Sequence, residues 1–314
     1  MNISIKRYDT SLRDDWSSVL ANSRNGIFIF DRNFIEYHGD RFTDFSAVAY
    51  LDGESVALLP ASIDLASGHA TSHAGLTFGG VVLKRNLRAT EAILLINALL
   101  DSLKDWGAKL LTVKLLPPVF CTYPSADVDY ALWQRGFSLV RRDLASVLPL
   151  SDSLPFNRLK VRSIKKALSA GLCAVMAPLD DFHALLVQVL KARHGASPVH
   201  SLAEMKLLAA RFPDRIFVRG ATKGDELLAG ALIFNYGHIW HAQYAANSEA
   251  GRVVGALDLV IERVAEEARS KGITHLSFGA STGTDRSVLN EGLMWQKESY
   301  GARSITHDFY SGAL

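Results

Sequence analysis

Three polar residues lie in one short stretch of the chain, and two of them, His241 and Tyr244, have side chains suited to proton transfer. Residues 239–245 are predicted to form a strand, and they include His241, Gln243 and Tyr244. A histidine titrates near neutral pH and can accept the proton of an attacking amine, while a tyrosine hydroxyl can protonate a leaving thiolate or hydroxyl group. Strict alternation along a strand places His241 and Gln243 on one face and Tyr244 on the other. A purely structural role is the alternative for each residue.

The elements around this strand follow from hydrophobic periodicity and turn residues. Residues 227–234 are apolar and predict a first strand, and the turn at residues 235–237 contains a glycine and closes a hairpin. A polar loop at residues 247–252 leads into a helix that begins near Gly255, because apolar residues recur there at helical spacing. Residues 274–278 predict a short buried strand after the helix.

This order of hairpin, loop, helix and strand resembles the core of the GNAT acyltransferase fold. In that family the acyl donor and the amine meet where two neighbouring strands separate. The pyrophosphate of coenzyme A lies at the N-terminus of the following helix, where free N–H groups and the helix dipole attract anions.

The GNAT loop signature has Gln or Arg first, Gly three residues later, and Gly or Ala in the sixth position. Arg252 and Gly255 match this pattern, and Leu257 in the sixth position departs from it. The resemblance implies that Gly251, Arg252, Gly255 and Ala256 bind the phosphates of the donor. A plain helix start after a polar loop is the alternative.

The composition limits the classes of partner. The chain has 314 residues, which suffices for one large or two ordinary domains, and its formal net charge of +2 does not favour binding to duplex DNA. Cys121 and Cys173 are not at a metal or redox spacing, and a reducing compartment suits this usage. The N-terminus lacks an apolar signal core, and no apolar run is long enough to span a membrane. We therefore expect a soluble cytoplasmic protein.

The two halves of the chain repeat the same order of predicted elements. Each half has a hairpin, an unusual loop, an apolar helix, a buried strand and a short closing segment, which reads Leu-Trp-Gln-Arg in one half and Met-Trp-Gln-Lys in the other. An internal duplication explains this echo. We expect an α/β (α+β) fold made of two GNAT-like domains in tandem, each a mixed twisted sheet flanked by helices. The domains span residues 1–150 and 151–314, and the last strand, 303–314, can belong to the first domain.

A basic helix is predicted at residues 158–171, between the two halves. Arg162 and Lys165 belong to its charged side, and Val161, Ile164 and Leu168 to its apolar side. The charged side is either a solvated helix face or a clamp for phosphates, for which Arg and Lys are suitable.

The basic helix and the end of the chain together resemble the FemABX family. The matching segments are Arg162–Ala167 with Gly171, Phe278–Ser281, and Trp295–Gly301. FemABX proteins have two GNAT-like domains and transfer an aminoacyl group from charged tRNA to an amine of a cell-wall precursor. The resemblance implies that Lys297 faces the reacting carbonyl or the donor's phosphates. An ammonium in that place stabilises developing oxyanion charge.

A FemAB-like branch, often found beside surface-glycan genes, is similar in further segments. These are residues 72–77, 194–200, 241–244 and 290–293. They contain His73, His194 and His200, which we expect to contact the substrate. By analogy with FemABX, the first half helps to bind a diphosphate-linked sugar of the acceptor. The histidines lack the His-Glu-x-x-His order of a zinc protease, so we expect no metal.

Residues 279–283 match the Gly-x-Ser-x-Gly elbow of hydrolases and follow a predicted strand. The residues after the elbow are polar rather than helical and apolar, and only one histidine follows, which argues against a hydrolase.

The sequence thus predicts an N-acyltransferase whose acceptor is an amino sugar or peptide linked to a nucleotide or lipid phosphate, as in cell-surface glycan or peptidoglycan-type precursors. A neutral amine attacks the activated carbonyl directly. Acyl-CoA fits the loop before Gly255, and aminoacyl-tRNA fits the basic helix. The alternative is a non-catalytic protein that binds a nucleotide sugar or glycan on the same scaffold.

Overall fold

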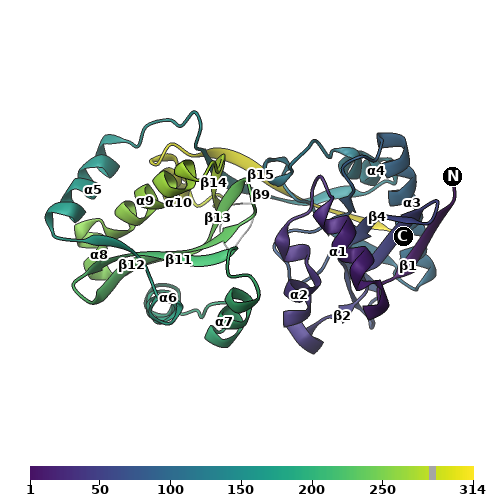
Figure 1. Ribbon diagram of the computed structural model, residues 1–314, viewed down its shortest axis with the longest axis horizontal. Coiled ribbons are helices and arrows are strands. Elements are labelled where there is room, and N and C mark those ends of the chain that lie inside the picture. Colours follow the sequence, from purple (N-terminus) through teal and green to yellow (C-terminus); the bar gives the residue numbers. More distant parts are fainter. Residues whose placement is uncertain (283–287) are drawn as a thin grey trace. The chain divides into compact units, whose positions relative to one another are not determined.

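Two long strands, β9 (Ser138–Pro149) and β15 (Arg303–Ala313), each contribute residues to both structural units of the protein. The computed structural model describes residues 1–282 and 288–314, apart from the side chains of Asp40 and His194. The N-terminal unit comprises Met1–Asp143 and Thr306–Leu314, and the C-terminal unit comprises Leu144–Ile305 (Figure 1).

The N-terminal unit contains a four-stranded sheet of order β1-β3-β4-β7 and a second run of strands, β15-β8-β6-β5-β2. The strands of the first sheet are β1 (Ile3–Arg7), β3 (Ala47–Leu51), β4 (Glu54–Leu59) and β7 (Val82–Leu83). The others are β2 (Thr43–Asp44), β5 (Ser62–Asp64), β6 (His69–Thr71) and β8 (Leu110–Lys114). The helices are α1 (Arg13–Ala21), α2 (Arg32–Ile35), α3 (Ala89–Asp105) and α4 (Asp127–Gln134), with short 3₁₀ turns η1 (Thr10–Leu12), η2 (Phe28–Phe30), η3 (Glu36–Arg41) and η4 (Pro118–Phe120).

The core of the N-terminal unit forms where α3 packs on the first sheet. Leu95, Leu99 and Leu103 recur along one side of α3 and are fully buried against alanines of β3. The β3–β4 hairpin turns at Asp52 and Gly53, which have φ values of 49° and 88°. Two consecutive positive φ values are what a two-residue type I′ turn requires, and Asp-Gly tolerates them.

The C-terminal unit contains strands in the order β10-β11-β12-β13-β14-β9. They are β10 (Cys173–Met176), β11 (Ile216–Lys223), β12 (Glu226–Asn235), β13 (Ile239–Asn247), β14 (His275–Ala280) and the end of β9. The helices are α5 (Arg158–Ser169), α6 (Leu179–His194), α7 (Leu202–Arg211), α8 (Glu249–Val254), α9 (Ala256–Ser270) and α10 (Glu291–Glu298). Figure 1 shows α5, α9 and α10 on one side of this sheet and α6 and α7 on the other.

The sheet of the C-terminal unit is covered by α9 on one face and by α6 on the other. Ala231, Ile233 and Trp240 pack with the apolar side of α9 in one buried cluster. On the opposite face, Phe182 of α6 lies so close that a Cβ added at Gly230 would be 2.7 Å from its ring. The strands, helix and turn predicted for residues 227–278 are thus present, with ends that differ by a few residues.

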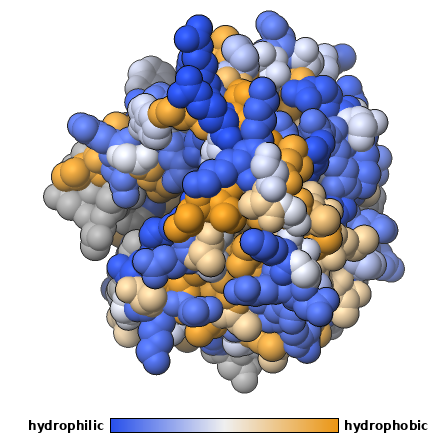
Figure 2. Space-filling model, turned by 90° about the vertical axis from the view of Figure 1, so that its left-hand side faces the viewer, coloured by the Kyte–Doolittle hydropathy of each residue, from blue (hydrophilic) through white to orange (hydrophobic). Residues whose placement is uncertain are grey.

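Two local predictions were wrong. The polar stretch before Gly255 is not a loop, because Glu249–Val254 forms α8, capped by the Ser248 hydroxyl. On α5, Val161 and Leu168 are exposed rather than inward-facing, and Ile164 and Ala167 are the buried residues. Figure 2, which views the side of the molecule where α5 lies in Figure 1, shows hydrophobic residues exposed among hydrophilic ones. Within the described part of the chain, no helix combines the length and apolar character needed to span a bilayer.

Candidate functional site

The neighbouring strands β13 and β14 separate partway along their length. They pair in parallel only at Ile239–His275, Trp240–Leu276 and His241–Ser277. Beyond these pairs β13 continues to Asn247 and β14 to Ala280, and β14 remains paired with β9. The separation of strands that the GNAT resemblance implies is therefore confirmed. Beyond His241, the edge of β13 that faces away from β12 has no pairing with β14.

A β-bulge in β13 changes which side chains share a face. Leu232 pairs with Tyr244 and Ile233 pairs with Ala242, so Gln243 is an extra residue without a partner on β12. An extra residue reverses the alternation of side chains after it. His241 and Tyr244 consequently lie on the same face of the sheet, and the prediction that they lie on opposite faces was wrong.

His241 is buried, with 6% of its surface exposed, next to the point where the two strands separate. Its Nδ1 lies 3.0 Å from the hydroxyl of Ser277, the residue it faces on β14. A Cβ added at Gly279 would lie 3.4 Å from the Cε1 of His241, so the backbone of β14 closes over the ring.

Tyr244 makes a short hydrogen bond with His200. The phenolic oxygen lies 2.7 Å from Nδ1 of His200, which precedes the first turn of α7. Burial raises the pKa of Tyr244 above its usual value of 10.0. The hydroxyl therefore keeps its proton at neutral pH and can act as a donor. Gln243 lies beside this pair, and its buried Oε1 has no hydrogen-bond partner among the described residues.

Lys297 of α10 holds the end of β14. Its Nζ donates to the carbonyl oxygens of Gly279 and Ala280, at 2.9 and 2.7 Å, and to the hydroxyl of Ser281 at 2.7 Å. Burial lowers the pKa of Lys297 to about 8. The three N–H groups of the ammonium thus bond to the segment at the end of β14, where β14 no longer pairs with β13. A direct contact of Lys297 with substrate stays a prediction.

The elbow motif of residues 279–283 does not present a nucleophile. Ser281 is fully buried and accepts a hydrogen bond from Lys297. Gly283 lies outside the described residues.

The start of α9 is packed against α5. Gly255 has a φ of 82°, and a Cβ there would lie 2.3 Å from Oγ and 2.6 Å from the carbonyl oxygen of Ser163. Gly251 is equally confined, because its Cβ would lie 2.5 Å from the carbonyl oxygen of Leu228. Ala256 is fully buried. Of the four residues predicted to bind the donor's phosphates, Arg252 and Gly255 line a cavity, and Gly251 and Ala256 are close packing contacts. Phosphate binding by these residues stays a prediction.

A carboxylate of the protein occupies the first turn of α9. Asp258 accepts a hydrogen bond from Lys160 at 2.7 Å and another from the hydroxyl of Tyr300. Burial and this carboxylate raise the pKa of Tyr300 well above its usual value of 10.0. A negative side chain here already interacts favourably with the helix dipole, so it competes with an external anion at this position.

Two adjoining cavities lie beside the end of β13. The first has a volume of about 500 Å³ and is lined by Lys160, Arg193, Arg252, Asp258 and residues of β13 and α10. The second, of about 490 Å³, shares Arg193 and Arg252 and extends along α8. Arg193 and Arg252 border both cavities, and two arginines suit a ligand that carries phosphates. Lys160 is paired with Asp258, and Glu249 also lines the second cavity.

The structure brings only some of the predicted site residues together. His241, Tyr244 and His200 lie on one face of the C-terminal unit, and Arg252 lines the cavities at the end of β13. Arg162 and Lys165 are exposed on α5. His73 belongs to the N-terminal unit, and the side chain of His194 lies outside the described residues.

The site residues that were not predicted from the sequence are Lys160, Arg193, Asp258, Ser277 and Tyr300. Two signals were available: Lys160 lies within the predicted basic helix, and Tyr300 lies within the Trp295–Gly301 segment that resembles FemABX. The contacts of Asp258 join α5, α9 and the segment after α10, and these segments are too far apart in the sequence for spacing to reveal them.

The comparisons with known proteins agree with this geometry. Residues 158–286 match the family described as acetyltransferase (GNAT) domain. The solved structure of FemX is similar over 100% of this chain and 98% of its own, with a TM-score of 0.70 and 13% identity. The structure of a tandem GNAT protein from the clavulanic acid biosynthesis pathway is similar over 99% of this chain and 98% of its own, with a TM-score of 0.53 and 10% identity. The structure of L-PGS from Bacillus licheniformis is similar over 98% of this chain and 92% of its own, with a TM-score of 0.60 and 10% identity. No curated protein matches the chain.

The class of the protein follows from these findings. The whole chain has the FemX-like fold of two GNAT-like units in tandem. Residues 158–286, in the C-terminal unit, match the acetyltransferase (GNAT) domain. The predicted fold and the predicted acyltransferase class are confirmed.

Proposed function

We propose that the protein is an N-acyltransferase whose donor binds in the C-terminal unit, at the end of β13. The observation that carries the proposal is the separation of β13 from β14 beyond His241, with a cavity of about 500 Å³ at the end of β13. The unpaired edge of β13 offers backbone N–H groups to the donor's carbonyl oxygen. Such donors stabilise the negative charge that develops on this oxygen during acyl transfer.

The reaction is a direct transfer. The nitrogen of a neutral amine attacks the carbonyl carbon, the bond from that carbon to the donor's sulfur or oxygen breaks, and the amine loses a proton. We assign proton acceptance to His241 and protonation of the leaving group to Tyr244. Lys297 positions β14 for this reaction through its contacts with Gly279 and Ala280.

Acyl-CoA is the donor that we favour, because residues 158–286 form a GNAT domain. Since Asp258 occupies the first turn of α9, we assign the donor's phosphates to Arg193 and Arg252, which line both cavities. Aminoacyl-tRNA is the second candidate. The exposed basic side of α5, with Arg158, Arg162 and Lys165, is the observation in its favour.

The acceptor that we propose is the amine of a phosphate-linked amino sugar or of a cell-surface glycan or peptidoglycan-type precursor. This assignment rests on the FemABX-like fold and on the sequence segments shared with that family. A non-catalytic protein that binds a nucleotide sugar or glycan is the alternative.

The test incubates the purified protein with acyl-CoAs, or with charged tRNA, and a panel of amino sugars and their nucleotide-linked forms. The mass of the acceptor and the release of free thiol are followed. We expect thiol release that depends on an acceptor, with a matching gain in acceptor mass. Acylation from charged tRNA alone would overturn the assignment of the donor. Ligand binding without turnover under any condition would support the non-catalytic alternative.

A further inference from the structure

The outer side of α5 carries cationic side chains and no acidic residue. The sequence of the helix contains neither Asp nor Glu, and its exposed cations are Arg158, Arg162, Lys165 and Lys166. At 3.6 residues per turn these four side chains project within a sector of about 100°, on the side opposite the buried face of the helix. Among the described residues, the α5 cation that has a carboxylate partner is Lys160, which lies inside this sector's opposite half and bonds to Asp258.

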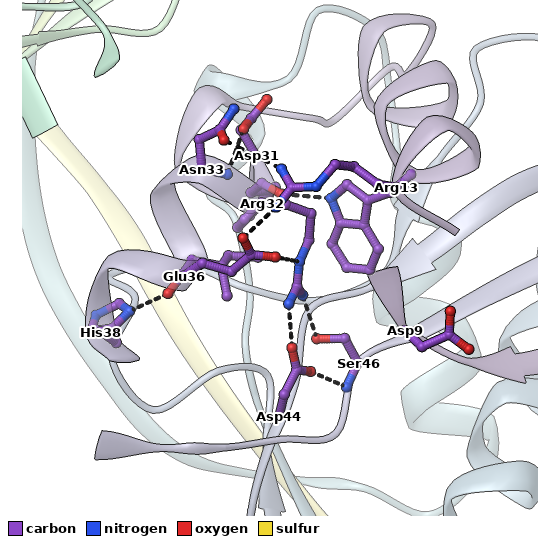
Figure 3. Close-up of polar contacts among 12 residues, drawn as sticks. Asp9, Arg13, Asp31, Arg32, Asn33, Glu36, His38, Asp44 and Ser46 are labelled. Atoms are coloured by element: carbon purple, nitrogen blue, oxygen red, sulfur yellow. Dashed lines mark hydrogen bonds and ion pairs between the residues drawn. The ribbon is translucent and has the colours of Figure 1, made fainter. Parts of the chain in front are cut away.

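Cations of other helices are, by contrast, paired with carboxylates. Figure 3 shows Arg13 and Arg32 bonded to the carboxylate of Glu36. Lys206 of α7 pairs with Asp180 of α6 in the same way. The positive charge on the outer side of α5 lacks such compensation within the described part of the chain, so it attracts an anionic partner.

Apolar side chains flank the cations and face solvent. Leu159 lies on one side of the cationic sector and is 56% exposed, while Val161 and Leu168 lie on the other side and are 40% and 46% exposed. Next to α5, α8 exposes Val253 to 65%. Figure 2 shows such hydrophobic patches among hydrophilic ones on the side of the molecule where α5 lies. Exposed apolar residues that are rimmed by polar ones mark an interaction surface.

The rest of the C-terminal unit holds this surface in place. Ile164 and Ala167 anchor α5 in the buried cluster that it shares with α9. The side chain of Asn157 caps the helix by accepting from the backbone N–H of Lys160 at 2.9 Å, and the backbone N–H of Asn157 donates to the carbonyl oxygen of Ser299 at 2.9 Å. The core contacts of α5 are therefore already made, and its outward leucines are part of a preformed surface.

The combination of cations with aliphatic side chains fits an anionic lipid surface. Long Lys and Arg side chains reach the phosphates of lipid headgroups, while leucine and valine side chains enter the boundary of the acyl chains. A polynucleotide would be attracted by the same cations, but its bases stack on aromatic side chains, and α5 has none. The aliphatic residues thus favour lipid over nucleic acid.

We propose that the outer face of α5, together with Val253 of α8, docks the C-terminal unit onto a membrane surface that contains anionic phospholipids. The helix lies along the surface, with its cations at the headgroups and its flanking leucines and valine among the upper parts of the acyl chains. This inference goes beyond the proposed function, because docking requires neither the donor nor the acceptor.

The test measures co-sedimentation of the whole protein with two kinds of vesicle, one of phosphatidylcholine alone and one of an equal mixture of phosphatidylcholine and phosphatidylglycerol. The double variant Arg162→Gln and Lys165→Gln removes two cations. The double variant Leu159→Gln and Leu168→Gln removes two apolar side chains and keeps every charge, and glutamine preserves helix propensity in both.

The matched control is the double variant Arg13→Gln and Lys206→Gln, which also removes two cations, each of them paired with a carboxylate. Thermal unfolding confirms that each variant is folded. We expect the wild type to bind the mixed vesicles at least about tenfold more tightly than phosphatidylcholine, each α5 variant to lose about tenfold in affinity for the mixed vesicles, and the control to bind them like the wild type.

The inference is overturned if the wild type binds neither kind of vesicle or both equally, or if either α5 variant binds the mixed vesicles as tightly as the wild type. Uncharged tRNA is titrated in parallel. Binding of tRNA that is lost in Arg162→Gln and Lys165→Gln, without vesicle binding, would assign this face to a polynucleotide instead. Vesicle binding by a protein that transfers no acyl group would overturn the proposed function and leave this inference standing, and acyl transfer without vesicle binding would do the reverse.

Discussion

Two single side chains, Lys297 and Tyr244, make contacts near the point where β13 and β14 separate. The ammonium of Lys297 donates to three acceptors at the end of β14, while the hydroxyl of Tyr244 pairs with His200 on the same face as His241. The first residue shapes the backbone beside the proposed reaction site, and the second is able to donate a proton to it. These roles predict different results when each side chain is changed.

Replacing Lys297 by methionine should lower the free energy of unfolding at pH 7 by about 2 kcal/mol, because the buried acceptors of β14 lose their donor. The effect also depends on pH. The pKa of Lys297 is about 8 in the folded protein against 10.5 for an unperturbed lysine. The unfolded chain therefore binds more protons between these values, and the stability of the wild type relative to Lys297→Met should rise from pH 8 to pH 10.5.

Chemical denaturation of the wild type and Lys297→Met at several pH values provides the measurement. Lys271→Met, an exposed lysine at the end of α9, is the control. A stability difference that stays constant over this pH range would contradict burial as the cause of the lowered pKa.

Replacing Tyr244 by phenylalanine should lower kcat by about 100-fold and leave the KM for the acceptor nearly unchanged, because it removes a proton donor and little volume. Steady-state kinetics provide the measurement, with Tyr130→Phe on the exposed side of α4 as the control. A variant that retains full kcat would show that Tyr244 only positions His200.

At the scale of elements, the approach of α5 to the start of α9 depends on one glycine. Gly255 combines a positive φ with a contact in which no Cβ fits, since Ser163 lies directly opposite. Gly272 at the other end of α9 has a similar φ of 74° and no atom within 4 Å of the position of a Cβ. The two glycines therefore separate the cost of conformation from the cost of packing.

Gly255→Ala should lower the free energy of unfolding by about 3 kcal/mol, and Gly272→Ala by about 1 kcal/mol. The difference between the two losses is the free energy needed to move α5 away from α9. Urea denaturation of both variants provides the measurement. Equal losses would mean that α5 shifts freely, and the Lys160–Asp258 contact would then not be a fixed feature of the cavity.

At the scale of the whole molecule, charge and fold suggest different donors. The net charge of +2 is small, yet α5 exposes a row of cations that could contact a polynucleotide. The match of residues 158–286 to the acetyltransferase (GNAT) domain is, by contrast, the reason why we propose acyl-CoA. The phosphates of a tRNA extend further from the acyl group than those of coenzyme A. Substitutions on the exposed side of α5 should therefore affect the reaction with charged tRNA and leave the reaction with acyl-CoA unchanged.

The double variant Arg162→Gln and Lys165→Gln should leave turnover with acyl-CoA unchanged, because both residues are exposed and neither lines the cavities at the end of β13. Rates measured between 50 and 200 mM salt, an interval over which phosphate contacts weaken strongly, provide the measurement. Arg193→Gln, which removes a cavity residue, serves as the positive control and should raise the KM for acyl-CoA. A loss of activity restricted to charged tRNA, with a shallower salt dependence, would instead identify tRNA as the donor.

Local patterns in the sequence determined the elements of this protein and their order. The apolar stripe of α3, the Asp52-Gly53 turn and the succession β12, β13, α9, β14 are all set by residues within a few positions of one another, which is why periodicity and turn chemistry predicted them. The repeated order of elements likewise predicted two units.

The tertiary structure decided the features that depend on residues far apart in the chain. The bulge at Gln243 arises from the pairing of β13 with β12, and it places Tyr244 on the same face of the sheet as His241, against the prediction. Asp258 meets Lys160 and Tyr300 because α5, α9 and the segment after α10 converge. Such contacts join residues far apart in the chain, and no spacing within one segment encodes them.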